Sequence, residues 1–187
     1  MSGEAPPRKI PDLSLAQSLF TLRSQPSSSP SYTAARTHLL TQIAEKSLAP
    51  LYLLLKDDLS DWSQSTYDEL KKKNDEEEEK MDAKLNEAKE MNGESEVSEA
   101  LIAKFTFLTT ILDKVFSIRD MADKQDRALT AHRVAMEKTP TLGSKIDLVF
   151  MVIRLGLFFS DADLIARNVE KAQWYGPFRI SRGGLLL

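Results

Sequence analysis

The 187-residue chain has no cysteine and only two histidines. The lack of cysteine excludes disulfides, thiolate metal sites and cysteine nucleophiles, and it fits a reducing compartment. Aromatic residues make up only 7% of the chain, whereas charged residues make up 28%. This balance is typical of a well-solvated helical protein rather than a β-sandwich.

Long apolar runs are also scarce. The longest, Ile146–Phe159, has 14 residues and contains Arg154. It is too short to span a membrane, so we interpret it as a buried helix. The first ten residues hold two prolines and no apolar core of a secretory signal. We therefore expect a soluble protein of the cytoplasm and nucleus with no membrane partner.

Charge is unevenly distributed along the chain, although the net charge is only −3. From Lys56 to Glu99 there are 16 acids and 7 bases, net −9, and the remainder is net +6. Such asymmetry fits either a solvated helix or a face that lies on a basic neighbour. The overall acidity gives no reason to expect nucleic acid as a partner.

Apolar residues recur at helical spacing along most of the chain, and no segment alternates with the period of a strand. Helices are predicted over about 13–23, 32–46, 48–55, 63–92, 95–112, 124–138 and 144–159, with a last one that ends at Ala172. Short turns between helices favour antiparallel hairpins, and successive hairpins make a solenoid. Leu155-Gly156 followed by Phe159 partly matches a tetratricopeptide (TPR) helix, in which the small Gly156 would let the paired helix approach closely. We therefore predict an all-α fold of stacked, TPR-like helical hairpins.

Capping residues predict where these helices begin and end. Asp12 is expected to cap the first helix, Ser47 the third and Ser144 the seventh. Either Asp161 or Asp163 caps the last helix. Gly93 is expected to end the long helix as its C-terminal glycine.

The long helix carries a thin apolar seam. The seam consists of Tyr67, Leu70, Met81, Leu85 and Ala88. The other faces are charged, and we expect the pairs Asp68–Lys72, Glu69–Lys73 and Glu76–Lys80 at i,i+4 spacing. Polar residues such as Asn74 interrupt a strict heptad, so packing across other helices of the chain is favoured over a coiled-coil dimer.

A search for reactive groups finds no active site. His38 and His132 lie on separate amphipathic helices and are interpreted as structural, because two isolated histidines cannot close a zinc site. The acidic run Asp75–Glu79, with Asp82, lacks the alternation and turn glycine of a calcium loop and is interpreted as a solvated face.

Two further patterns give no support for ligands. Gly143-Ser144-Lys145 lacks the upstream glycine of a phosphate-binding loop. Trp174, Tyr175, Phe178, Arg179 and Arg182 form one short basic-aromatic stretch, which is poor support for nucleic acid. We predict no catalytic residue, no metal site, no cofactor and no small-molecule substrate.

Several short motifs follow one another in the order found in a known family. They are Pro11-Asp12-Leu13, Ala16-Gln17, Leu48-Ala49-Pro50 with Tyr52, Lys73-Asn74-Asp75-Glu76, Gly93-Glu94-Ser95-Glu96, Ala128-Leu129-Thr130-Ala131, Asp147-Leu148-Val149-Phe150, Arg154-Leu155-Gly156-Leu157-Phe158 and Asp163-Leu164-Ile165-Ala166-Arg167-Asn168. Over about residues 10–172 the chain resembles the PCI-type lid subunit numbered seven among the non-ATPase subunits of the 26S proteasome regulatory particle.

The resemblance implies a right-handed helical-repeat arm with a long N-terminal helix, leading in the full family to a winged-helix PCI module. It also implies a non-catalytic role in ubiquitin-dependent degradation, with other lid and base subunits as partners. The expected organisation is a disordered tail (1–11), N-terminal helices (12–62), the long charged helix (63–93), truncated TPR-like repeats (94–172) and an atypical, disordered tail (173–187).

The chain departs from the family in two places. About ten surplus residues lie between positions 105 and 124, and the tail after Ala172 no longer resembles the family. We interpret both as gene-model joins, which would leave the chain as a truncated solenoid. In such a solenoid Ile146–Phe159 would be partly uncovered, so we expect the isolated protein to be poorly soluble. Alternatives are a signalosome-type PCI subunit and a small helical adaptor that dimerises through its long helix.

Overall fold

A computed structural model of the protein describes residues 9–91, 93–113 and 127–175. Within these ranges there are eight helices and no strand. The helices are α1 (Leu13–Ser24), α2 (Pro30–Lys46), α3 (Ala49–Leu54), α4 (Gln64–Glu90), α5 (Glu94–Thr110), α6 (Arg127–Lys138), α7 (Leu142–Phe159) and α8 (Ala162–Tyr175). The predicted all-α class is confirmed, and α8 extends three residues beyond its predicted end at Ala172.

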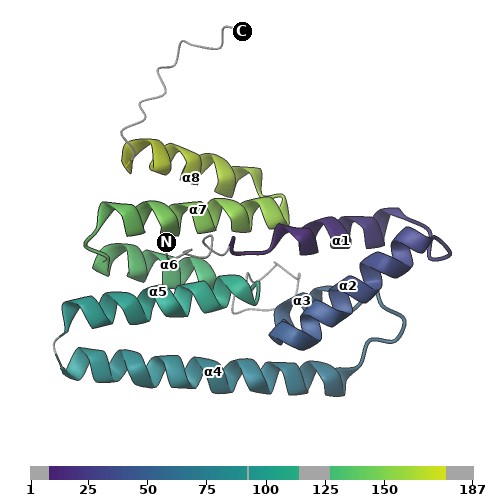
Figure 1. The fold of residues 1–187 in the computed structure, drawn as a ribbon, viewed down its shortest axis with the longest axis horizontal. Coiled ribbons are helices and arrows are strands. Elements are labelled where there is room, and N and C mark those ends of the chain that lie inside the picture. Colours follow the sequence, from purple (N-terminus) through teal and green to yellow (C-terminus); the bar gives the residue numbers. More distant parts are fainter. Residues whose placement is uncertain (1–8, 92, 114–126, 176–187) are drawn as a thin grey trace, which may run out of the picture.

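The helices pair as antiparallel hairpins that stack in layers (Figure 1). α1 packs against α2, α5 against α6, and α7 against α8, while α4 lies along α5 at the edge of the stack. The α7–α8 hairpin lies over the α5–α6 hairpin, and α1 contacts α7. The hairpin arrangement is as predicted, whereas the right-handed, TPR-like geometry and the predicted domain boundaries stay predictions.

Local hydrogen bonds explain several helix starts. The Asp12 carboxylate accepts a hydrogen bond from the Ser14 N–H at 3.0 Å, which confirms it as the N-cap of α1. The Asp161 carboxylate accepts from the Leu164 N–H at 2.9 Å and so satisfies a donor in the first turn of α8. Pro50 lies in the first turn of α3, where its missing N–H costs no helical bond.

Three predicted cap roles are wrong. Ser47 has φ 52° and ψ 48°, so it ends α2 in the left-handed conformation instead of capping α3. Gly93 has φ −83° and precedes α5, so it is not a left-handed terminator of α4. The cap of α7 is Thr141, whose Oγ1 accepts from the Ser144 N–H at 3.3 Å, and Ser144 itself lies in the first turn.

The core consists of two apolar clusters. The first joins α1, α2 and α3 to parts of α4, α5, α6 and α7, and its most deeply buried side chains include Leu39, Leu48, Leu55 and Leu155. The second joins α4 to α8 and is built from Leu85, Leu101, Phe105, Ala135, Leu148, Val152 and Leu164. Leu129 and Ala131 pack against both clusters, so the buried surface is continuous along the stack.

The seam of α4 is used inside the chain. Leu70, Asn74, Leu85 and Ala88 are buried, and most of the remaining α4 surface is exposed. An interface for a coiled-coil dimer would need this same seam, so the dimer alternative loses its contact surface. The ion pairs differ from those expected: Lys72 pairs with Glu76, and Lys80 with Glu77.

Arg154 ties the segment before α1 to α7. Its guanidinium donates to three consecutive backbone carbonyls, those of Lys9 at 3.2 Å, Ile10 at 3.3 Å and Pro11 at 2.7 Å. An arginine fork suits such a set of carbonyl oxygens because its donors lie in one plane. Arg154, a charged residue inside the longest apolar run, therefore has a structural role, because it joins the N-terminal segment to the α7–α8 hairpin.

Candidate interaction surfaces

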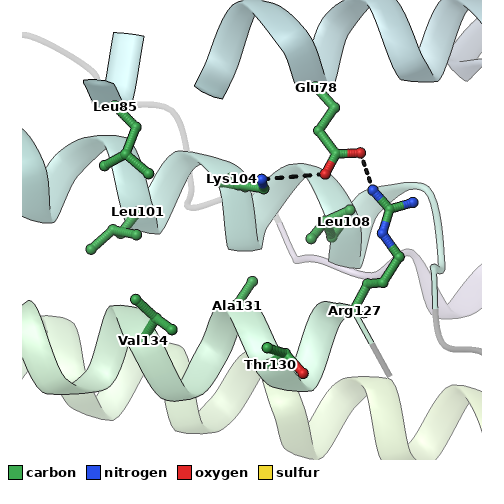
Figure 2. A pocket seen from close by; sticks show the side chains of 9 residues that line it. All are labelled: Glu78, Leu85, Leu101, Lys104, Leu108, Arg127, Thr130, Ala131 and Val134. Carbon is green, nitrogen blue, oxygen red and sulfur yellow. Dashed lines mark hydrogen bonds and ion pairs between the residues drawn. The ribbon is translucent and has the colours of Figure 1, made fainter. Parts of the chain in front are cut away.

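A groove lies between α4 and α6, with α5 as its floor (Figure 2). It forms because α4 and α6 each pack on α5 but not closely on each other. Its volume is about 290 Å³. The lining is mostly apolar and consists of Leu85, Leu101, Leu108, Ala131 and Val134, with Glu78, Lys104, Arg127 and Thr130 at the rim.

A charged network closes one end of this groove (Figure 2). Glu78 lies between the ammonium of Lys104, at 3.3 Å, and the guanidinium of Arg127. Lys104 also contacts Asp82 at 2.5 Å, and Arg127 contacts Asp113 at 2.9 Å. Burial lowers the pKa of Arg127, but the hydrogen bond to Glu78 and the charge of Asp113 outweigh it, so its pKa is raised. The guanidinium therefore stays charged at any physiological pH.

The predicted solvated acidic face is correct for four residues of the run Asp75–Glu79 and wrong for Glu78. Asp75, Glu76, Glu77 and Glu79 are exposed, but the Glu78 side chain is only 18% exposed between two cations. Its place on the seam side of the helix, between Asn74 and Met81, was the signal that the sequence offered. This signal was easy to miss because Glu78 is one of five consecutive acidic residues, which together suggest an exposed face.

A second surface is an apolar stripe along the outer face of α7. Leu142, Phe150 and Leu157 are 53%, 51% and 49% exposed, and Ile146 and Ile153 between them are half-buried. The spacing of these five residues places them on one side of the helix. The α7 stripe confirms that the apolar run is partly uncovered, and exposed apolar patches of this kind mark protein contacts or aggregation sites.

The two histidines lie in different layers, and the structural role expected for them stays a prediction. The Nδ1 atom of His38 on α2 forms a hydrogen bond of 2.9 Å with the Ser18 hydroxyl on α1. His132 on α6 is 5% exposed, its ring centroid lies 5.3 Å from that of Phe105, and its Nε2 has no hydrogen-bond partner. Burial, helped by the charges of Lys171 and Arg133, lowers the pKa of His132 to about 4.

The buried imidazole makes stability depend on pH. His132 binds a proton near pH 6.5 in the unfolded chain but only near pH 4 in the folded chain, so the unfolded state binds more protons. We expect the free energy of unfolding to fall by about 2 kcal/mol between pH 7 and pH 5. Urea unfolding across this range measures it, and H132L should flatten the profile. A His38→Gln control should keep the slope, and an equally steep profile in H132L would contradict this account.

The other sequence patterns produce no site among the described residues. Neither a cluster of three potential metal ligands nor a helix long and apolar enough to cross a membrane occurs in the described ranges. Gly143 lies in the first turn of α7. Trp174 is 85% exposed at the end of α8, and Phe178, Arg179 and Arg182 lie outside the described residues, as do most of the surplus residues between 105 and 124.

Comparison with known proteins identifies the family. The model of the family described as 26S proteasome subunit RPN7 matches residues 63–175, which run from the start of α4 to the end of α8. The chain belongs to this family. The match thus includes the helices that form the groove and the α7 stripe.

Relatives of the RPN7 family extend the similarity to the N-terminal helices. The 26S proteasome non-ATPase regulatory subunit 6 of Dictyostelium discoideum is 36% identical over 168 residues, which is 89% of this chain and 40% of that protein. Its homolog in Arabidopsis thaliana is 32% identical over 92% of this chain, and the Schizosaccharomyces pombe regulatory subunit rpn7 is 29% identical over 88%. The chain spans about 40% of the length of the relatives it matches.

Proposed function

We propose that this RPN7-family chain is a non-catalytic structural component of the lid of the 26S proteasome regulatory particle. It supports ubiquitin-dependent protein degradation by holding other lid and base subunits, in the cytoplasm and nucleus. The observation that carries the proposal is the family match over α4–α8, together with relatives that are named 26S proteasome regulatory subunits.

The structure supports a scaffold in two physical ways. Its core is continuous from α1 to α8, so close packing of side chains holds each hairpin rigidly against the next. Three large apolar side chains of the α7 stripe are about half exposed. A partner that covers them would remove apolar surface from water, which favours binding. Rigid display of such surfaces needs no reaction chemistry.

Titratable groups in the described residues also favour a role without catalysis. Lys104 and Arg127 are held by Glu78, Asp82 and Asp113, which suits a structural network. His132 is enclosed against Phe105, out of reach of a substrate. The Ser18 hydroxyl and the His38 imidazole share a hydrogen bond of 2.9 Å, and we interpret this pair as a contact that joins α1 to α2.

Co-purification tests the proposed function. The tagged 187-residue chain, co-expressed with recombinant lid subunits, is expected to recover at least one of them at a defined stoichiometry. A Phe150→Asp variant should recover less, because it places a charge on the α7 stripe while its exposed position leaves folding intact. Recovery of no lid subunit by the wild-type chain would overturn the assignment of this chain to the lid.

A further inference from the structure

We propose that the groove between α4 and α6 receives an amphipathic helix from a neighbouring subunit, whose apolar stripe is flanked by basic residues on the α4 side. This inference rests on the proposed function only for the source of the helix. The surface is distinct from the α7 stripe, because it lies between α4 and α6 over α5 (Figure 2).

The size of the groove favours side chains of a helix over a whole small molecule. Pockets that bind small molecules run from roughly 300 to 1,000 Å³, and this one, at about 290 Å³, is at the bottom of that range. Its lining extends from Glu78 to Leu85 on α4 and from Arg127 to Val134 on α6. Each wall therefore extends about 10 Å, or two helical turns. That length suits apolar anchors at i, i+3 or i+4, and i+7 of one docked helix.

The rim of the groove has an excess of acid on the α4 side. Asp75, Glu78, Glu79 and Asp82 recur at helical spacing along this edge, and Asp75 acts electrostatically on Arg127, so this edge faces the groove. The two rim cations, Lys104 and Arg127, are already bonded to Glu78, Asp82 and Asp113. Glu79 stays exposed with its negative charge.

The excess of acidic residues on the α4 edge of the groove determines which charges a docked helix should carry. A helix with an acidic flank next to α4 would meet like charges, whereas lysine or arginine there would meet the exposed carboxylate of Glu79. Asp75 on the same edge is already paired with Lys71 at 2.8 Å. Nucleic acid is itself negatively charged and would be repelled by this acidic edge. An RPN7-family chain with this groove would therefore select its partner helix by position of charge as well as by shape.

Site-specific photo-cross-linking tests the groove. A photoreactive amino acid replaces Val134, which lines the groove and is 41% exposed, in the full chain assembled with recombinant lid subunits. The expected product joins Val134 to one other subunit, and its mapped peptide has apolar residues at i, i+3 or i+4, and i+7 with lysine or arginine beside them. A probe at Phe20, which is 66% exposed on α1, should not give this product.

A charge variant makes the test specific. Glu79→Lys should lower the yield of the Val134 product by at least about threefold, because it turns an attraction into a repulsion. Glu87→Lys makes the same charge change at an exposed position on another side of α4 and should leave the yield unchanged. Thermal unfolding checks that both variants fold like the wild type.

The outcomes separate this inference from the proposed function. If no lid subunit is recovered, the lid assignment fails. If lid subunits are recovered but the Val134 probe gives no inter-subunit product, or joins only to its own chain or to a second copy of it, the groove proposal fails alone. A product with an acidic or uncharged peptide, or one insensitive to Glu79→Lys, also overturns it.

Discussion

Replacing Phe105 with alanine is expected to lower the free energy of unfolding by about 3–5 kcal/mol. The Phe105 side chain is 0% exposed and belongs to the cluster that joins α4, α5, α6, α7 and α8. Its removal takes apolar atoms from the core and leaves a cavity that rigid helices on all sides cannot fill. Because a domain is commonly stable by only about 5–15 kcal/mol, this loss would bring the folded state close to its limit.

Urea denaturation followed by circular dichroism measures this loss. The matched control is Phe20→Ala on α1, since the Phe20 side chain is 66% exposed and loses little burial when truncated. We expect the control to change stability by less than about 1 kcal/mol. A Phe105→Ala variant that loses no more than the Phe20→Ala control would show that the second cluster does not hold the stack together.

Helix positions could be predicted from the sequence because the apolar period alone determines which face of each segment can be buried. The seam residues Leu70, Leu85 and Ala88 are buried, as their spacing indicated. Helix ends were harder to predict, because three of the helices in the described ranges end at a left-handed residue other than glycine. Ser47, Leu112 and Ser160 all have φ between 52° and 62°.

The hydrogen bonds at these ends show why a glycine was not required. The Leu48 N–H donates to the Ile43 carbonyl at 3.1 Å, and the Asp161 N–H donates to the Gly156 carbonyl at 2.9 Å. Both are the long closing bond of a Schellman motif, which satisfies carbonyls that the helix leaves free. In the first case, Leu48 follows the left-handed Ser47 and is 0% exposed. We infer that the burial of Leu48 offsets the conformational strain of Ser47. Sequence rules that look for glycine miss such ends.

The groove could not be predicted from the sequence because its charges meet only in the folded chain. Glu78 contacts Lys104 from the next helix and Arg127 from the helix beyond it. Within the sequence, Glu78 is one of five consecutive acids, and its spacing from Asn74 and Met81 indicates burial but not which cations it contacts. The open space depends on α4 and α6 diverging over α5, which is a property of helix packing and not of any one segment.

Close approach of α7 and α8, by contrast, was expected from the sequence at Gly156 and leads to the second large prediction. A β-carbon at Gly156 would lie 2.8 Å from Ile165 Cγ1 and 3.4 Å from the backbone oxygen of Asp161. We expect Gly156→Leu to lower the free energy of unfolding by about 3 kcal/mol, because the overlap involves backbone as well as side-chain atoms and α8 must move away. Gly156→Ala should cost less, since alanine gains up to about 1 kcal/mol of helix propensity.

Gly143 provides the matched control for Gly156, because it lies in the same helix and a β-carbon there would meet nothing within 4 Å. We expect Gly143→Ala to be neutral or slightly stabilising in the same thermal and urea unfolding measurements. Because α8 covers one side of α7 directly at Gly156, the leucine variant should also expose more of α7 to hydrogen exchange than the wild type does. If Gly156→Leu unfolds at the same denaturant concentration as Gly143→Ala, the α7–α8 contact is looser than these distances indicate, and α8 does not depend on a glycine at this crossing.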